Sequence, residues 1–128
     1  MAGAAVTTDE QLLYEETNNI APYTYRFIAK LIAPITTNNL KQLDHISASL
    51  GFDPIPYWQE VQAPVLMAFG GHDKNVPVEA SIARLKENNL NHFEVKAYPD
   101  GGHAIRDIQT NEVSGEYLQD LVKFVNKQ

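Results

Sequence analysis

Apolar side chains recur at three- and four-residue intervals through the first 50 residues, the spacing of helices with one apolar face. A polar helix is expected to begin at Thr8, which opens a capping-box pattern. A second helix is expected over residues 22–33, because Pro34 cannot continue it. A third is expected over residues 40–50, before Gly51, a residue type that often ends helices. The pattern therefore predicts an all-helical N-terminal part.

The pattern changes at Asp53-Pro54-Ile55-Pro56, where two prolines in four residues predict a connector without regular structure. Residues 65–69 then form a continuous apolar run, as in a parallel strand that is buried on both faces. In residues 93–97 apolar and charged side chains alternate, which predicts a strand with one wetter face, nearer the sheet edge. Between the two runs, apolar residues at helical spacing predict a helix that begins near Pro77.

Strand, helix and strand in this order predict a right-handed parallel βαβ unit. A last helix is expected after Ser114, which is a suitable N-cap residue. Its apolar positions predict a stripe that is buried against the sheet, made of Leu118, Leu121, Val122 and Val125. The expected fold class is therefore α/β, with a short parallel sheet flanked by helices and a helical N-terminal segment.

Composition narrows the class of protein. The chain has 128 residues, a net charge of −6, no cysteine and no clustered basic run. Binding to nucleic acid or to an anionic membrane is not expected, because both need concentrated positive charge. The absence of cysteine excludes disulfides and thiolate metal sites, and the apolar runs are too short for a transmembrane helix. A cytoplasmic location and no cofactor are the expectations that remain.

Two strands each run into a Gly-Gly loop that ends on a residue capable of proton chemistry. Gly70 and Gly71 precede His72 and Asp73, and Gly101 and Gly102 precede His103. Because parallel strands end at the same edge of a sheet, Asp73 and His103 are expected on one rim. A carboxylate that accepts from imidazole Nδ1 would leave Nε2 free to take a proton. The alternative is that Asp73 caps the following helix and His103 is an ordinary loop residue; a metal site with His72 lacks a recognised ligand spacing.

Several of these segments, in this order, resemble the C-terminal part of α/β-hydrolases, closest to dienelactone-hydrolase and prolyl-oligopeptidase-like esterases and peptidases. They are residues 53–58, 61–66, 70–73, 75–77 and 98–103. The resemblance implies that Asp73 is the triad acid, that His103 is the base, and that small esters or peptides are substrates. It also implies a partial α/β-hydrolase fold in two parts, a helical lid-like segment over residues 1–52 and a βαβα unit over residues 53–128.

The sequence departs from that family in one respect, because it contains no Gly-x-Ser-x-Gly motif. The resemblance places the nucleophile strand and the oxyanion-hole loop upstream of Met1. The serine whose surroundings come nearest to this motif is Ser49, but it is predicted to end a helix and not to follow a strand. We therefore expect a truncated family member that is inactive alone. The alternative is a non-catalytic binding or oligomerisation module on a hydrolase-derived scaffold.

The same departure predicts association. In the complete fold the strand at residues 65–69 would have a neighbour on each side, and here one neighbour is missing from the sequence. An unprotected apolar strand edge favours pairing with another chain. We expect either a homodimer through this edge or a complex with a missing N-terminal half.

Overall fold

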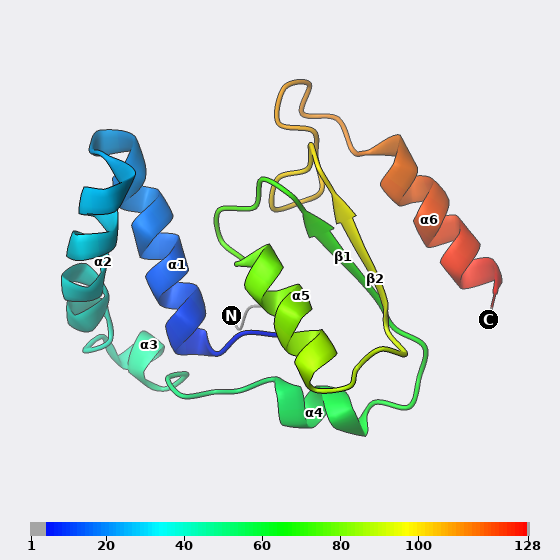
Figure 1. The fold of residues 1–128 in the computed structure, drawn as a ribbon, viewed down its shortest axis with the longest axis horizontal. Helices are drawn as coiled ribbons and strands as arrows, with labels where there is room; N and C mark the ends of the chain where they lie inside the picture. The colour runs from blue at the N-terminus through cyan, green and yellow to red at the C-terminus, as the bar shows by residue number, and fades with distance from the viewer. Residues whose placement is uncertain (1–4, 128) are drawn as a thin grey trace.

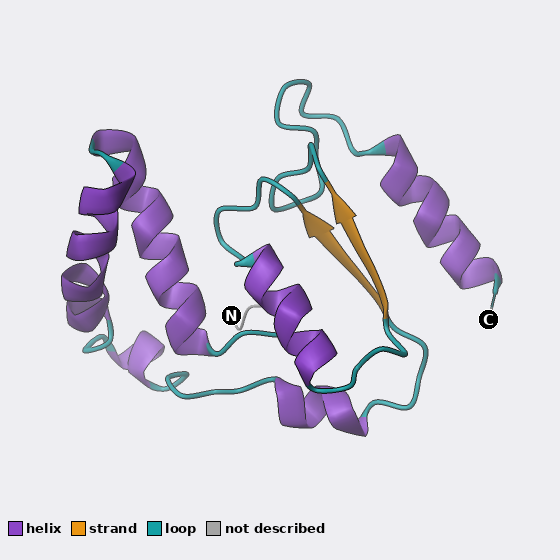
Figure 2. Ribbon diagram, viewed as in Figure 1, coloured by secondary structure: helices purple, strands orange, loops and turns teal. Residues whose placement is uncertain are grey.

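The computed structural model describes residues 5–127, drawn in Figure 1. In chain order the elements are α1 (Thr8–Ile20), a short 3₁₀ helix (Ala21–Tyr23), α2 (Arg26–Leu40), α3 (Asp44–Ser47), α4 (Ile55–Glu60), β1 (Leu66–Gly70), α5 (Val78–Glu87), β2 (Glu94–Tyr98) and α6 (Gly115–Asn126). Figure 2 shows the two strands side by side, with helices around them. The fold class is α/β, as the sequence predicts.

The sheet positions the site. Strands β1 and β2 are parallel, with Leu66 opposite Glu94 and Gly70 opposite Tyr98. Their crossover is α5, so the predicted βαβ unit is present. Because the strands are parallel and in register, the loops that follow Gly70 and Tyr98 leave the sheet at the same edge.

The two faces of the sheet meet different helices. Met67 and Phe69 of β1 form one buried cluster with Leu85 of α5 and with Phe93. On the other face, the Tyr98 ring contacts the Tyr117 ring of α6 edge-on, with centroids 5.6 Å apart. The buried apolar core therefore lies on the α5 side of the sheet. Burial of each such side chain stabilises a fold by roughly 1.5–3 kcal/mol.

Helices α1 and α2 pack as an antiparallel hairpin beside the α/β unit (Figure 1). The expected capping box exists one residue earlier than predicted. The Thr7 hydroxyl accepts from the Glu10 amide at 3.3 Å, and the Glu10 carboxylate accepts from the Thr7 amide at 2.8 Å. Thr8 is buried and its amide donates to the carbonyl of Phe52 at 3.1 Å, so Thr8 ties the helix to the connector instead.

The expectation that Pro34 ends the second helix is wrong, because α2 continues to Leu40. A proline inside a helix removes one backbone hydrogen bond and crowds the preceding turn. Packing compensates here, since Ala29, Ala33 and Thr37, spaced four residues apart on one helix face, are all buried. Small side chains on this face allow close approach to α1.

Two further local expectations are corrected. Residues 40–50 do not form one helix; Leu40 ends α2, only the four residues of α3 are helical after it, and turns follow. Gly51 does adopt a left-handed conformation, with φ of 73°. The connector at Asp53–Pro56 is not irregular, because α4 begins at Ile55. Proline fits the first turn of a helix, where its missing N–H would have no partner.

The apolar face of the last helix is exposed, contrary to the prediction that it is buried. The exposed fractions are 48% for Leu118, 37% for Leu121, 59% for Val122 and 61% for Val125. Ser114 caps the helix as expected, and its hydroxyl accepts from the Tyr117 amide. Helix α6 contacts the sheet through Tyr117 and through Asp120, whose carboxylate lies 3.6 Å from the Lys96 ammonium. Amphipathic spacing shows which residues share a face, and the packing partners decide whether that face is covered.

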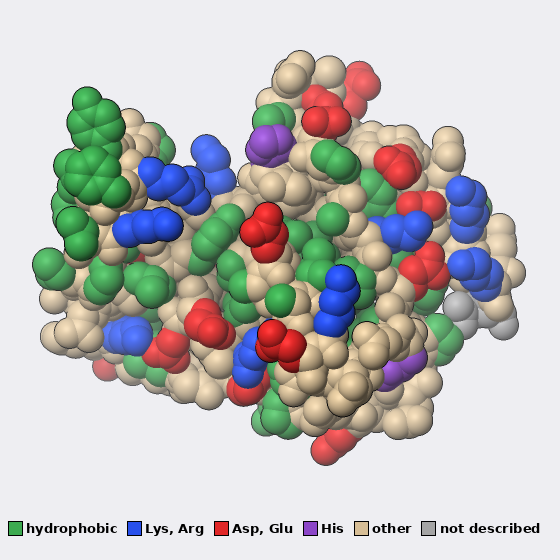
Figure 3. Space-filling view, viewed as in Figure 1, with side chains coloured by type: hydrophobic (Ala, Val, Ile, Leu, Met, Phe, Trp, Pro, Cys, Tyr) green, Lys and Arg blue, Asp and Glu red, His purple; other side chains and the backbone are tan. Residues whose placement is uncertain are grey.

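A second apolar surface lies on α2 and the residues before it. Figure 3 shows hydrophobic side chains gathered over this hairpin, at the left of the view. The most exposed members are Tyr23, Tyr25, Phe27, Leu31 and Ile35. No described helix is long and apolar enough to cross a membrane.

Candidate active site

The first half of the site is the loop that follows β1. Asp73 ends a tight turn in which its amide donates to the Gly70 carbonyl at 3.0 Å. Its carboxylate Oδ1 accepts from the amides of Asn75 and Val76, at 2.8 and 3.1 Å. The carboxylate therefore holds its own loop, a role that occupies only one of its oxygens. The alternative that it caps the following helix is wrong, because α5 begins at Val78 and its N-terminus has no side-chain cap hydrogen bond.

The second half is the loop that follows β2. The Gly102 amide donates to the Arg106 carbonyl at 2.8 Å, which closes a short turn around His103. Ile105 in this turn has φ of 54°, a left-handed conformation that is rare for a β-branched residue. Such a conformation costs on the order of 1–3 kcal/mol. Ile105 is buried, so packing holds the turn in a shape that its backbone alone would not prefer.

Glycine is required where these two loops meet. The His72 amide donates to the Gly101 carbonyl at 2.8 Å, and the Gly71 amide donates to the Tyr98 carbonyl at 2.8 Å. A Cβ on Gly71 would lie 2.7 Å from the Pro99 carbonyl oxygen, closer than real contacts allow. The sheet hydrogen bonding thus continues past the strands and brings the Asp73 loop against the His103 loop.

The structure places Asp73 and His103 in direct contact. Imidazole Nδ1 of His103 lies 3.0 Å from carboxylate Oδ2 of Asp73, which is a hydrogen bond. The Asp73 side chain is 5% exposed, whereas the His103 side chain is 54% exposed. The imidazole is therefore oriented by a buried acceptor at Nδ1 while the rest of its ring faces solvent. This arrangement suits a base that must reach a molecule outside the protein.

The other candidates from the sequence do not join this pair. The Ser49 hydroxyl lies in the turns after α3 and donates to the Ile46 carbonyl at 2.9 Å, so its partner is not His103. His72 is exposed. Within residues 5–127, no three His, Asp or Glu side chains are grouped so that they could hold a metal ion.

Helix α1 contributes contacts to the site that the sequence analysis missed. The Tyr14 hydroxyl donates to the Asp73 carbonyl at 2.8 Å, and the Asn18 side-chain amide donates to the Lys74 carbonyl at 3.1 Å. These residues are separated from the Asp73 loop by more than 50 positions. Their i, i+4 spacing places them on one helix face, but nothing local indicates what that face contacts.

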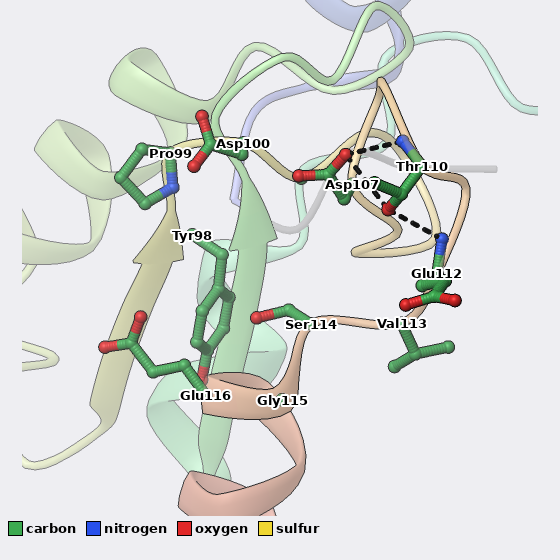
Figure 4. A pocket seen from close by; sticks show the side chains of 11 residues that line it. Tyr98, Pro99, Asp100, Asp107, Thr110, Glu112, Val113, Ser114, Gly115 and Glu116 are labelled. Atoms are coloured by element: carbon green, nitrogen blue, oxygen red, sulfur yellow. Dashed lines mark hydrogen bonds between the residues drawn. The ribbon is translucent and has the colours of Figure 1, made fainter.

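An acidic cavity of about 290 Å³ lies between the end of β2, the loop after His103 and the start of α6 (Figure 4). Its lining residues include four acidic ones, Asp100, Asp107, Glu112 and Glu116. The Asp107 carboxylate accepts from the amides of Gln109 and Thr110, both at 2.8 Å. Hydrogen bonds from Thr110 and then Gln109 hold the pKa of Asp107 below its ordinary value. Asp107 therefore stabilises the loop that carries His103.

Tyr98 forms the wall of this cavity nearest the sheet. It is 3% exposed, and its hydroxyl donates to the Asp120 carboxylate at 3.2 Å. Burial, and next the negative charge of Asp120, raise the pKa of Tyr98 to about 12. Tyr98 is therefore a protonated structural tyrosine that links β2 to α6.

Comparison with known proteins identifies the family of the chain. The sequence model of the prolyl oligopeptidase family matches residues 2–128. The chain therefore belongs to the prolyl oligopeptidase family, whose members are α/β-hydrolases. The resemblance inferred from the motifs is confirmed. No curated protein and no solved structure matches the chain.

Proposed function

We propose that Asp73 and His103 are the acid and base of a hydrolase triad that acts on small esters or peptides. The observation that carries this proposal is the 3.0 Å contact between Asp73 Oδ2 and His103 Nδ1, with the imidazole otherwise open to solvent. Asp73 fixes the tautomer and stabilises the imidazolium that forms, and His103 Nε2 takes the proton of an attacking hydroxyl and later gives it to the leaving group.

The nucleophile in this proposal is not among these 128 residues. The sequence has no Gly-x-Ser-x-Gly turn, and the Ser49 hydroxyl is bonded within its own turn. Covalent catalysis needs a hydroxyl within reach of the base, and the tetrahedral intermediate needs donors for its oxyanion. We infer that the chain by itself does not turn over esters or peptides, and that polypeptide outside it supplies both groups.

Two measurements test this proposal. The purified chain should hydrolyse p-nitrophenyl acetate no faster than buffer and should take up no fluorophosphonate probe; stoichiometric labelling of Ser49 would refute the assignment. Coexpression with the polypeptide encoded directly upstream, if its reading frame holds a serine elbow, should restore labelling and turnover. Asp73→Asn and His103→Ala should then abolish turnover, and full activity in either variant would refute the proposed roles.

A second candidate function is a non-catalytic module for association, and the exposed apolar faces favour it. Leu31 on α2 and Val125 on α6 are 70% and 61% exposed, and each is part of a larger apolar surface. In this proposal the chain pairs with a second copy through the side of β1 that does not face β2, because a strand edge with unpaired backbone groups readily adds another strand. Sedimentation equilibrium should report about twice the chain mass of 14.3 kDa. A monomer over the whole concentration range would remove this candidate.

A further inference from the structure

Two side chains of α1 hold the backbone of the loop that carries Asp73. The Tyr14 hydroxyl donates to the carbonyl of Asp73 itself, at 2.8 Å, and Asn18 Nδ2 donates to the carbonyl of Lys74, at 3.1 Å. Asn18 Nδ2 also donates to the Tyr14 carbonyl at 3.1 Å, which fixes the direction of the amide group. Consecutive carbonyls of the loop are therefore held by consecutive turns of one helix.

These contacts act on the residue whose carboxylate faces His103. The Asp73 carboxylate is held from two sides, by loop amides on Oδ1 and by the imidazole on Oδ2. The Tyr14 bond adds a third constraint, on the main chain of the same residue. Because a side chain moves with its own backbone, a shift of the Asp73 carbonyl changes the distance and angle of the carboxylate to the imidazole.

Tyr14 also borders a cavity beside the Asp73 loop. Its side chain lines a cavity of about 420 Å³ together with Gly71 and the first turn of α5. Tyr14 therefore lies beside this space while its hydroxyl holds the Asp73 loop.

We propose that Tyr14, assisted by Asn18, is a positioning residue for the Asp73–His103 pair. The helical segment that the family resemblance treats as a lid thereby sets the geometry of the acid. This inference rests on the proposed function only where it gives the Asp73–His103 pair a catalytic role. The hydrogen bonds from Tyr14 and Asn18 to the Asp73 loop exist without turnover. Tyr14 acts through Asp73 and does not touch the reacting atoms.

The test uses the tautomer of His103 and needs no activity. In the wild-type chain, ¹⁵N NMR of the imidazole at a pH where it is neutral should show the proton mainly on Nδ1, donated to Asp73. Tyr14→Phe removes one hydroxyl and keeps the ring. The ratio of the Nε2–H to the Nδ1–H tautomer should rise about 3- to 10-fold, the change expected from one lost hydrogen bond. Asp73→Asn should change the ratio further and serves as the positive control.

Tyr98→Phe is the matched control. It also removes one tyrosine hydroxyl that donates to an oxygen acceptor, but that acceptor is Asp120 on α6. We expect a similar loss of stability in both variants and a change in the His103 tautomer only in Tyr14→Phe. Equal tautomer ratios in Tyr14→Phe, Tyr98→Phe and the wild type would overturn the proposal.

Amide hydrogen exchange supplies a second readout in case Tyr14→Phe folds poorly. In Asn18→Ala, the amides of Asn75 and Val76, which donate to Asp73, should exchange about 3- to 10-fold faster than in the wild type. Unchanged exchange would count against the proposal. If the tautomer shifts while the triad assignment fails in the activity tests, the positioning relation stands and the proposed function falls. If the activity tests succeed and Tyr14→Phe leaves the tautomer ratio unchanged, the proposed function stands and the positioning role of Tyr14 is refuted.

Discussion

A Cβ placed on Gly70 would lie 2.5 Å from the carbonyl oxygen of Gly101. No side chain can occupy that position, so the end of β1 and the loop after β2 touch backbone to backbone. Asp73 lies three residues beyond the first glycine and His103 lies two residues beyond the second. The close approach of the two loops therefore determines the distance between the carboxylate and the imidazole.

Gly70→Ala should disrupt both the fold and the Asp73–His103 contact. The added methyl group must push the two loops apart, which costs about 1–3 kcal/mol in a packed region. Urea unfolding should show that loss, and the His103 tautomer should shift with it. Gly115→Ala is the control, because a Cβ there meets nothing within 4 Å. It should be neutral or stabilise the chain by up to about 1 kcal/mol; equal effects of the two substitutions would contradict this view of the loops.

The ion pair between Asp53 and Arg84 should make stability depend on acid. The Arg84 guanidinium, 2.6 Å from Asp53 Oδ2, holds the pKa of that carboxyl below its ordinary value of 3.8. A lowered folded-state pKa stabilises the fold above 3.8, and this contribution disappears as pH falls through the folded pKa. Asp53→Asn should therefore cost about 1 kcal/mol or less at neutral pH, because the pair is partly solvated. The difference from the wild type should vanish in strong acid; a constant difference would contradict the linkage.

Tyr98 should affect stability at the opposite end of the pH range. Its pKa is raised from 10.0 to about 12, so the folded state holds its proton more tightly than the unfolded chain. Its contribution is complete below pH 10 and is lost as pH rises toward 12. A tyrosinate absorbance titration of the folded chain should contain one late component that Tyr98→Phe lacks. Its presence in that variant would mean that another tyrosine is responsible.

Two leucines of equal size should respond very differently to truncation. Leu85 of α5 is 1% exposed and lies in the core cluster, whereas Leu31 of α2 is 70% exposed. Leu85→Ala should destabilise the chain by about 2–5 kcal/mol, and Leu31→Ala by no more than about 0.5 kcal/mol. Chemical denaturation at several protein concentrations checks both values. A large cost for Leu31→Ala that grows with concentration would show instead that α2 is buried in an association.

Much of the α/β unit could be predicted because its signals are local. The apolar run before Gly70 and the alternating run before Tyr98 predicted β1 and β2 to within a residue at each end. Ser114 was correctly predicted to cap α6, because capping depends on the neighbouring amide alone. Where tertiary packing opposed a local preference, the prediction was wrong. Pro34 was expected to stop a helix that packing against α1 carries through.

By itself, the sequence determined the order of strand, acid, helix, strand and histidine, and so the family and the candidate acid–base pair. These features depend on the periodicity of apolar residues and on short motifs. Both are properties of neighbouring residues in the sequence and do not depend on how distant segments pack. Only the tertiary structure decided that α1 holds the Asp73 loop through Tyr14 and that the apolar faces of α2 and α6 are exposed. Contacts between residues far apart in the chain, and the exposure of a helix face, depend on which elements pack together. That packing is a property of the whole fold and not of any local segment.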